Sequence, residues 1–232
     1  MNEVKIIPVK GLPEIKPGDD LAELTFKSLT ENKTEVLSND VFIFTQKIVS
    51  KSEGMAKNLN EISFEELLES QTKYVIRKRG DLVISKTKHG FICANAGIDK
   101  SNVENNYALL LPEDPNKSAK YIRNNLIKLL NVEVSVIISD TFGRAWRKGQ
   151  VNFAIGSSGI KPIASYIGTL DSFNNELHAT EVAIIDELAS AGELVMAKSI
   201  DVPIAIIRGY NYEQSSEDAS ELIRNDNEDF FL

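Results

Sequence analysis

The chain has 232 residues, with 26 Lys or Arg against 34 Asp or Glu, so its formal net charge is −8. This acidic balance disfavours broad binding to nucleic acids or to anionic membranes, because their phosphates would be repelled at long range. No stretch approaches the roughly 20 apolar residues that cross a bilayer, and the N-terminus lacks the apolar core of a signal peptide, so we expect a cytoplasmic protein.

The first half of the chain is predicted to mix short strands with short helices. A strand is predicted over residues 4–9, and a Gly- and Pro-rich loop with a fixed path follows over residues 11–18. Two helices are expected where a capping side chain is followed three residues later by Glu; these starts are Asp20 with Glu23 and Ser63 with Glu66. Two further strands are predicted, over residues 41–44 and 81–86.

The second half holds the longest predicted elements. A helix is predicted over residues 118–130, and a strand rich in β-branched residues over residues 132–139, ending at Asp140. The Gly-rich passage at residues 153–162 is interpreted as a turn between two elements. A long helix and a last strand complete the chain, at about residues 180–198 and at residues 202–207. Because the elements do not alternate strictly, the predicted fold class is α+β, with mixed sheets and packed helices.

Cysteine and histidine are too scarce for the common soft-metal sites. The single cysteine, Cys93, excludes an intramolecular disulfide and a cysteine-cluster metal site, and its apolar neighbours predict a buried, inert side chain. His89 is interpreted either as a base or as a strand-end residue, and with His178 it makes only two histidines, too few to favour a zinc site. Any metal would therefore be a hard cation held by oxygen ligands.

Acidic and hydroxyl side chains mark two places where such a cation could bind. Asp99 precedes Asn102 in a polar loop, and Asp140 precedes Thr141 directly after the most hydrophobic strand. Carboxylate and hydroxyl oxygens suit Mg²⁺ or Mn²⁺, which commonly shares the oxygens of a bound phosphate. The alternative is that Asp99 is only a turn residue and Asp140 only a cap.

Two basic clusters stand beside these acidic residues. Lys47 and Lys51 are four residues apart, and Arg144, Arg147 and Lys148 follow Asp140 closely. In an acidic chain, local positive charge near possible metal ligands favours a site for phosphoryl groups. The alternative is a solvated surface with scattered ion pairs of little energetic weight.

The common nucleotide and hydrolase motifs are absent from the sequence. The sequence contains no P-loop motif, and Gly156-Ser157-Ser158-Gly159 lacks the lysine that would complete one. No GxGxxG motif follows a predicted strand. The same segment does not fit a GxSxG elbow, so a turn is favoured over nucleophilic catalysis by Ser157 or Ser158.

Taken in order, these motifs resemble the coenzyme F420-0:γ-glutamyl ligase family. The resemblance covers nearly the whole chain, in segments 11–21, 46–54, 88–102, 139–160, 186–199 and 202–210. It implies one ligase domain over residues 1–232, built as two intertwined lobes, without the nitroreductase-like domain that some bacterial members carry.

The resemblance also implies an activity. Members are GTP-dependent amide ligases that add L-glutamate to F420-0 through an acyl phosphate, assisted by a divalent cation (Mg²⁺ or Mn²⁺) and by K⁺, and they form homodimers. Two alternatives stay open at this point. One is a related ligase acting on a different phosphorylated carboxylate, and the other is a nucleotide-binding regulator without catalytic activity.

Carried over position by position, the resemblance assigns roles to particular residues. The divalent ions would be held by Asp99, Asp140 and Thr141. The nucleotide would be contacted by Leu12, Pro13, Glu14, Ile15, Gln46, Lys47, Lys51 and Asn102. Asp140, Lys51 and Arg144 are the residues expected to act in catalysis.

A few positions depart from the family pattern or add to it. Ala145 stands where many members have Pro, and Lys198 stands where members often have Gln. If that side chain normally helps to hold a second metal ion, a lysine cannot replace it; the alternative is that the lysine contacts phosphate directly. Asp186 and Glu187 are further acidic residues expected near the site, although acidic side chains at a helix start are commonly capping charges.

Overall fold

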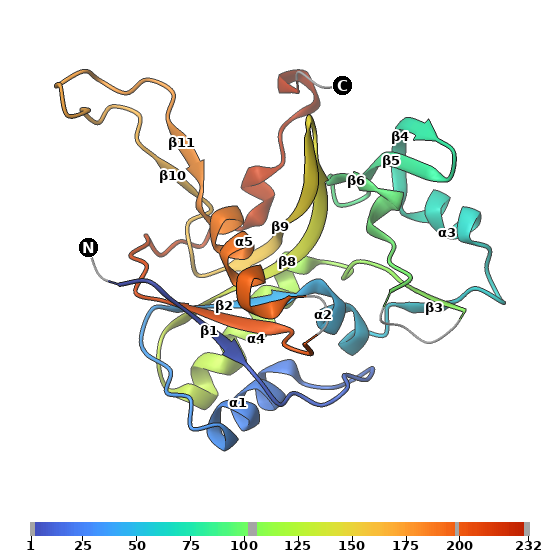
Figure 1. The fold of residues 1–232 in the computed structure, drawn as a ribbon, viewed down its shortest axis with the longest axis horizontal. Helices are drawn as coiled ribbons and strands as arrows, with labels where there is room; N and C mark the ends of the chain where they lie inside the picture. The colour runs from blue at the N-terminus through green and yellow to red at the C-terminus, as the bar shows by residue number, and fades with distance from the viewer. Residues whose placement is uncertain (1–2, 102–105, 198–199, 230–232) are drawn as a thin grey trace.

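The computed structural model describes residues 3–101, 106–197 and 200–229, which form a mixed α+β fold as predicted (Figure 1). A five-stranded sheet lies at its centre, and only its β2–β8 pair is parallel among the described strands. Its strands, in sheet order, are β1 (Lys5–Val9), β12 (Ile204–Arg208), β2 (Asp40–Thr45), β8 (Val134–Arg144) and β9 (Arg147–Ser158).

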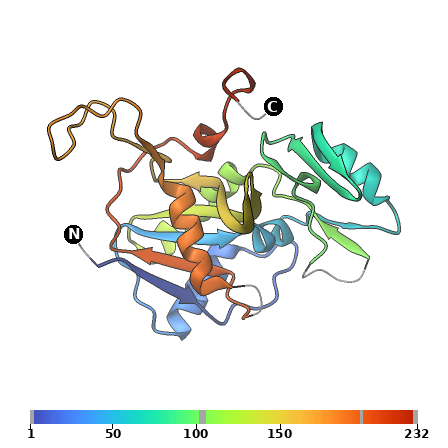
Figure 2. The same ribbon diagram turned by 45° about the horizontal axis from the view of Figure 1, so that its top comes forward.

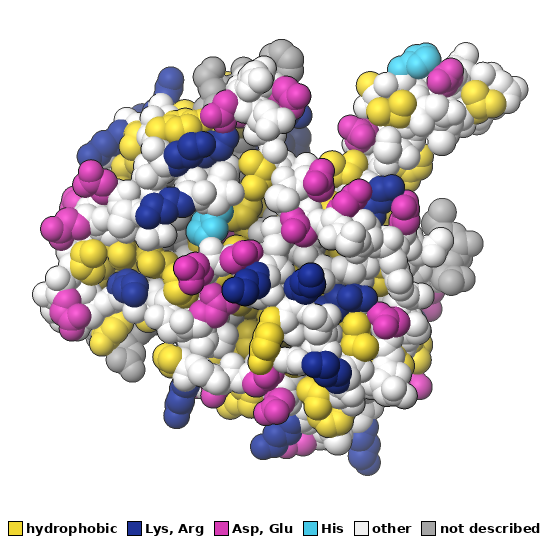
Figure 3. Space-filling view, turned by 180° about the vertical axis from the view of Figure 1, so that it is seen from behind, with side chains coloured by type: hydrophobic (Ala, Val, Ile, Leu, Met, Phe, Trp, Pro, Cys, Tyr) yellow, Lys and Arg dark blue, Asp and Glu magenta, His cyan; other side chains and the backbone are white. Residues whose placement is uncertain are grey.

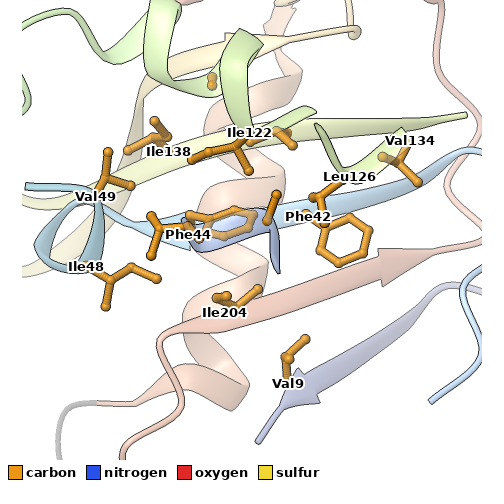
Figure 4. Close-up of a cluster of buried hydrophobic side chains, with 14 of the residues drawn as sticks. Val9, Phe42, Phe44, Ile48, Val49, Ile122, Leu126, Val134, Ile138 and Ile204 are labelled. Carbon is orange, nitrogen blue, oxygen red and sulfur yellow. The ribbon is translucent and has the colours of Figure 1, made fainter. Parts of the chain in front are cut away.

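Helices cover both faces of this sheet. Helices α1 (Leu21–Glu31) and α4 (Pro115–Leu130) pack on one face, and α5 (Ile184–Met196) lies across the other (Figure 2). Strand β2 shows why every residue of its VFIF run is apolar: successive side chains point to opposite faces. Phe42 and Phe44 pack with α4 side chains (Figure 4), whereas Val41 and Ile43 join the cluster under α5.

Smaller elements extend from the central sheet. A three-stranded sheet is made by β4 (Thr72–Arg79), β5 (Leu82–Thr87) and β6 (Ile92–Ala94). Helix α3 (Phe64–Gln71) directly precedes β4 in the sequence (Figure 1). The remaining helices and strands are α2 (Gln46–Ser52), β3 (Ala56–Asn58), η1 (Asn95–Gly97), β7 (Tyr107–Leu109), β10 (Ile163–Ser165), β11 (Glu181–Ala183), η2 (Ala219–Leu222) and η3 (Asp226–Glu228).

The main correction concerns the segment after residue 139. Strand β8 does not end at Asp140 but continues to Arg144 and pairs with β9. Residues 153–158, predicted to be a turn, are the second half of β9. Gly156 is required there because a Cβ would lie 2.4 Å from the carbonyl oxygen of Pro115. The glycine therefore allows α4 to pack closely on β9, and only Gly159, with φ of +88°, belongs to a turn.

Three helices also differ from prediction. α4 begins at Pro115, three residues early, since Asp114 accepts a hydrogen bond from the Lys117 N–H at 3.0 Å. α5 begins only at Ile184, because the preceding residues pair with β10 as β11. α2 was not predicted at all.

In the part of the chain that the structure describes, no helix is long and apolar enough to cross a membrane.

Candidate active site

A cavity of about 480 Å³ opens at the carboxyl end of β2, where its parallel partner β8 continues past it. Thr45 and Ser139, which are register partners in these strands, both line it. The carboxyl ends of adjacent parallel strands are a common location for ligand sites. The other walls come from the loop at residues 12–15, from α2, from β9 and from the two ends of the α5–β12 connection.

Helix α2 carries three of the predicted residues into this cavity: Gln46, Lys47 and Lys51. The Gln46 side chain is 1% exposed, and its Oε1 accepts a hydrogen bond of 2.8 Å from the Ser50 hydroxyl one turn later. Its Nε2 is buried and has no hydrogen-bond partner among the described residues. Because a buried amide donor without a partner is costly, this group is suited to donate to a bound ligand.

Both lysines are already paired with carboxylates. The Lys51 ammonium lies 2.5 Å from Glu14 Oε1, and the Lys47 ammonium lies 2.9 Å from Asp99 Oδ2 and donates to Ser101 Oγ at 2.6 Å. For Asp99, burial raises the pKa, but the hydrogen bonds from Lys47 and Ser101 outweigh it and lower the pKa below its ordinary value. Asp99 therefore remains a carboxylate and anchors Lys47 at the cavity.

Strand β8 supplies the predicted metal ligands Asp140 and Thr141, and both line the cavity. The Thr141 hydroxyl donates to Oδ1 of Asn152, its partner on β9, at 2.7 Å. Asn152 Nδ2 in turn donates to Glu193 Oε2 on α5 at 2.9 Å. Asn152 and Glu193 also line the cavity, but sequence reasoning missed them, since only the β8–β9 register and the docking of α5 bring them to Thr141.

The structure brings most of the predicted site residues together. Nine of them line the cavity: Leu12, Pro13, Glu14, Ile15, Gln46, Lys47, Lys51, Asp140 and Thr141. Asp99 is joined to them through Lys47. Asn102 and Lys198 lie outside the described residues.

Other predicted residues lie elsewhere. Arg144 is not among the cavity residues: it lies at the far end of β8, where its Nη2 donates to the Lys148 carbonyl oxygen at 3.1 Å. Asp186 accepts from the Ala154 N–H at the edge of β9, at 2.8 Å, and Glu187 is exposed. Cys93 is buried as predicted, and its burial together with the nearby Asp140 charge raises its pKa to about 12.

The donor set fits a hard cation shared with a ligand better than a cation enclosed by protein. Among the residues that the structure describes, no three His, Cys, Asp or Glu side chains are grouped to hold a metal ion. Asp140 and Thr141 offer a carboxylate and a hydroxyl, and Mg²⁺ or Mn²⁺ commonly takes one or two such protein ligands and completes its shell with phosphate oxygens and water.

Comparison with known proteins places the chain in a family. Residues 11–209 match the F420-0:Gamma-glutamyl ligase family. The chain is 40% identical over 225 residues to the coenzyme F420:L-glutamate ligase of Methanothermobacter thermautotrophicus, covering 89% of each protein. It is 37% identical over 250 residues to that of Methanopyrus kandleri (98% of this chain, 97% of the relative), and 36% over 246 residues to that of Archaeoglobus fulgidus (97% and 95%). The resemblance noted from the sequence is thus confirmed, and the chain belongs to the F420-0:γ-glutamyl ligase family.

Proposed function

We propose that this protein is a cytoplasmic, GTP-dependent ligase that joins L-glutamate to coenzyme F420-0. The observation that carries the proposal is the cavity at the end of β2, beside β8, because it gathers nine residues that the family resemblance assigns to nucleotide and metal. These residues come from three separate segments of the chain. Such convergence of separate segments on one cavity favours a binding site over a solvated surface.

The proposed chemistry begins with a problem of charge. The terminal carboxylate of F420-0 would attack the γ-phosphorus of GTP, the bond to the GDP oxygen would break, and an acyl phosphate would form. Both reactants are anions, so the site must offset their repulsion. Asp140 and Thr141 would hold a divalent cation, Mg²⁺ or Mn²⁺, which supplies positive charge to the triphosphate when bound. K⁺ is proposed as a further activator, without assigned ligands.

Lys47 and Lys51 are the chain's own contribution to this neutralisation. Each is now paired with a carboxylate, Asp99 or Glu14, at the cavity. We propose that phosphate oxygens share or replace these contacts, since an ammonium has three donors and pairs readily with phosphate. Gln46 Nε2 would supply a neutral donor to the same nucleotide.

In the second step, the amine of L-glutamate attacks the acyl carbon. The C–N bond forms, inorganic phosphate leaves, and the amine loses its proton. No protein nucleophile is needed in this scheme, because the acyl phosphate is already activated toward the amine. Positioning and charge neutralisation carry the reaction.

The experiment is a mass-spectrometric assay of the purified protein with F420-0, L-glutamate, GTP and Mn²⁺. We expect products heavier by one or more glutamyl units, and no product when GTP, metal or glutamate is omitted. ATP in place of GTP tests the choice of nucleotide. If the protein binds GTP but yields no product from F420-0, the acceptor is a different phosphorylated carboxylate. If it hydrolyses no nucleotide with any acceptor, the ligase proposal fails.

A further inference from the structure

A chain of hydrogen bonds connects α5 to the proposed metal ligand Thr141. Glu193 Oε2 accepts from Asn152 Nδ2 at 2.9 Å, and Asn152 Oδ1 accepts from the Thr141 hydroxyl at 2.7 Å. Asn152 is 2% exposed, so its amide is held inside the wall of the cavity. A weaker contact of 3.4 Å joins Asn152 Nδ2 to the Ser139 hydroxyl.

The Glu193 carboxylate fixes the order of donors and acceptors along this series of hydrogen bonds. A carboxylate can only accept, so Glu193 requires the NH₂ side of the Asn152 amide to face it. The carbonyl side of the amide must then face Thr141, and the Thr141 hydroxyl has to donate its one proton to it. Toward every other neighbour, the Thr141 oxygen can act only as an acceptor or as a metal ligand.

A second observation shows how α5 is fixed against β9. Three side chains on one face of α5, at spacings of four and three residues, bond to β9: Asp186, Ser190 and Glu193. Asp186 accepts from the Ala154 N–H at 2.8 Å, and the Ser190 hydroxyl donates to the Asn152 carbonyl oxygen at 2.7 Å. Since β9 is an edge strand, these contacts satisfy backbone groups that no neighbouring strand reaches. Glu193 alone of the three bonds to a side chain in the cavity wall.

We propose that Glu193 and Asn152 are positioning residues that hold the Thr141 hydroxyl in its proton-donating orientation, so that its oxygen meets the divalent cation as a ligand. This inference rests on the proposed function, because it assumes that Thr141 meets a cation there. Side chains that orient a metal ligand in this way typically change metal affinity by about 10- to 100-fold when they are replaced.

The test measures Mn²⁺ binding and needs no acceptor turnover. Free Mn²⁺ is followed by electron paramagnetic resonance while the protein is titrated in the presence of GTP, without F420-0 and glutamate. Glu193→Gln keeps the size of the side chain but lets the Asn152 amide adopt either orientation, and we expect the Kd for Mn²⁺ to rise about tenfold or more. In a Thr141→Val background, the same substitution should add little, because the oriented hydroxyl is already gone.

Two control variants separate positioning from simple stabilisation of the edge strand. Ser190→Ala removes a contact between α5 and β9 but leaves the Asn152 amide in place, so it should lower the Tm while leaving the Kd for Mn²⁺ unchanged. Glu187→Gln, at an exposed position of α5, should change neither.

The outcomes are distinguishable. An unchanged Kd in Glu193→Gln, or an equal rise in Ser190→Ala, would overturn the positioning role while leaving the ligase proposal intact. Failure of the unsubstituted protein to bind Mn²⁺ with GTP would overturn both.

Discussion

At the residue scale, Asp140 is the side chain on which the proposed chemistry depends most directly. It lines the cavity from β8 beside Thr141 and is the carboxylate proposed to hold the cation. Asp140→Asn keeps the shape but removes the charge, so we predict a loss of metal-dependent ligase activity of roughly 100-fold or more, since even residues that only orient a metal ligand are worth about 10- to 100-fold. The measurement is the initial rate against Mn²⁺ concentration. A rate curve that matches the unsubstituted protein would remove Asp140 from the site.

Gln46 gives a second prediction at this scale, through Ser50. The Ser50 hydroxyl fixes the Gln46 amide so that Nε2, not Oε1, is the group without a protein partner. Ser50→Ala removes that bond, whose net worth is about 1 kcal/mol, equivalent to roughly fivefold in affinity. We expect the KM for GTP to rise about fivefold with little change in kcat.

Ser52→Ala is the matched control for this experiment. Ser52 lies on the same helix and donates to the Val49 carbonyl oxygen, but it does not line the proposed active-site cavity. If Ser50→Ala and Ser52→Ala behave alike in GTP kinetics, then Gln46 does not contact the nucleotide through an oriented amide.

The same residues show how far the sequence could predict the site. The 12–15 loop, both lysines and the Asp140–Thr141 pair lie in motifs that are contiguous in sequence, so a resemblance could locate them. Asn152 and Glu193 could not be located, because their proximity to Thr141 depends on strand register and helix docking. Arg144 does not line the cavity for a related reason: β8 stays extended, so three residues beyond Thr141 amount to about 10 Å.

At the element scale, strands made of continuous apolar runs could be predicted from the sequence. A strand that contains glycines and a very short helix could not. β2 and β12 were predicted within two residues, since each is buried on both faces. β9 was missed because its glycines look like a turn until α4 packs on Gly156. α2 was missed because it has only seven residues and its N-cap, Thr45, makes no side-chain capping bond.

The contact between α5 and β9 makes a prediction about stability and pH. Burial raises the pKa of Asp186 to about 6, although the hydrogen bond from the Ala154 N–H opposes this. Because the folded state holds this proton more tightly than the unfolded state, the contribution of Asp186 to stability is full below pH about 4 and is lost as the pH rises through about 6. Asp186→Asn should therefore remove that decline and stabilise the protein by about 1–3 kcal/mol above pH 6.

The measurement is the free energy of unfolding by urea at several pH values between 4 and 8, for both proteins. The difference between them should widen from pH 4 to pH 7 and then level off. A constant difference over this range would mean that Asp186 does not titrate as proposed.

At the scale of the whole molecule, the most prominent feature is an arm that stands clear of the body, with apolar and acidic side chains on its surface (Figures 1 and 3). The arm spans residues 163–183, and Phe173 at its turn is 83% exposed. The turn is nevertheless ordered, because Asp171 Oδ1 accepts from the N–H groups of Phe173 and Asn175, each at 2.8 Å. The arm also exposes Ile167 and Leu170, and several exposed apolar side chains on one hairpin are typical of a surface that meets a partner.

A second hairpin offers a surface complementary to the arm. The turn between β8 and β9 exposes Trp146 at 87% and carries Arg144, Arg147 and Lys148, whereas the arm carries Asp171, Glu176 and Glu181. In a two-fold homodimer the same pair of surfaces meets twice. The basic turn of each copy can therefore face the acidic arm of the other copy. We propose that the homodimer expected from the family resemblance forms through these two hairpins.

This proposal predicts that Phe173→Asp gives a monomer, because it removes the large apolar side chain from the contact and would require a carboxylate to lose its water there. Light scattering coupled to size-exclusion chromatography measures the mass directly, and Val75→Asp, at an exposed apolar position on β4, is the control that should stay dimeric. Raising the salt concentration should also weaken the dimer, since the opposite charges on the hairpins are exposed and therefore screened. A Phe173→Asp protein that remains dimeric would exclude the arm from the contact, and an unsubstituted protein that is monomeric at assay concentration would exclude the dimer itself.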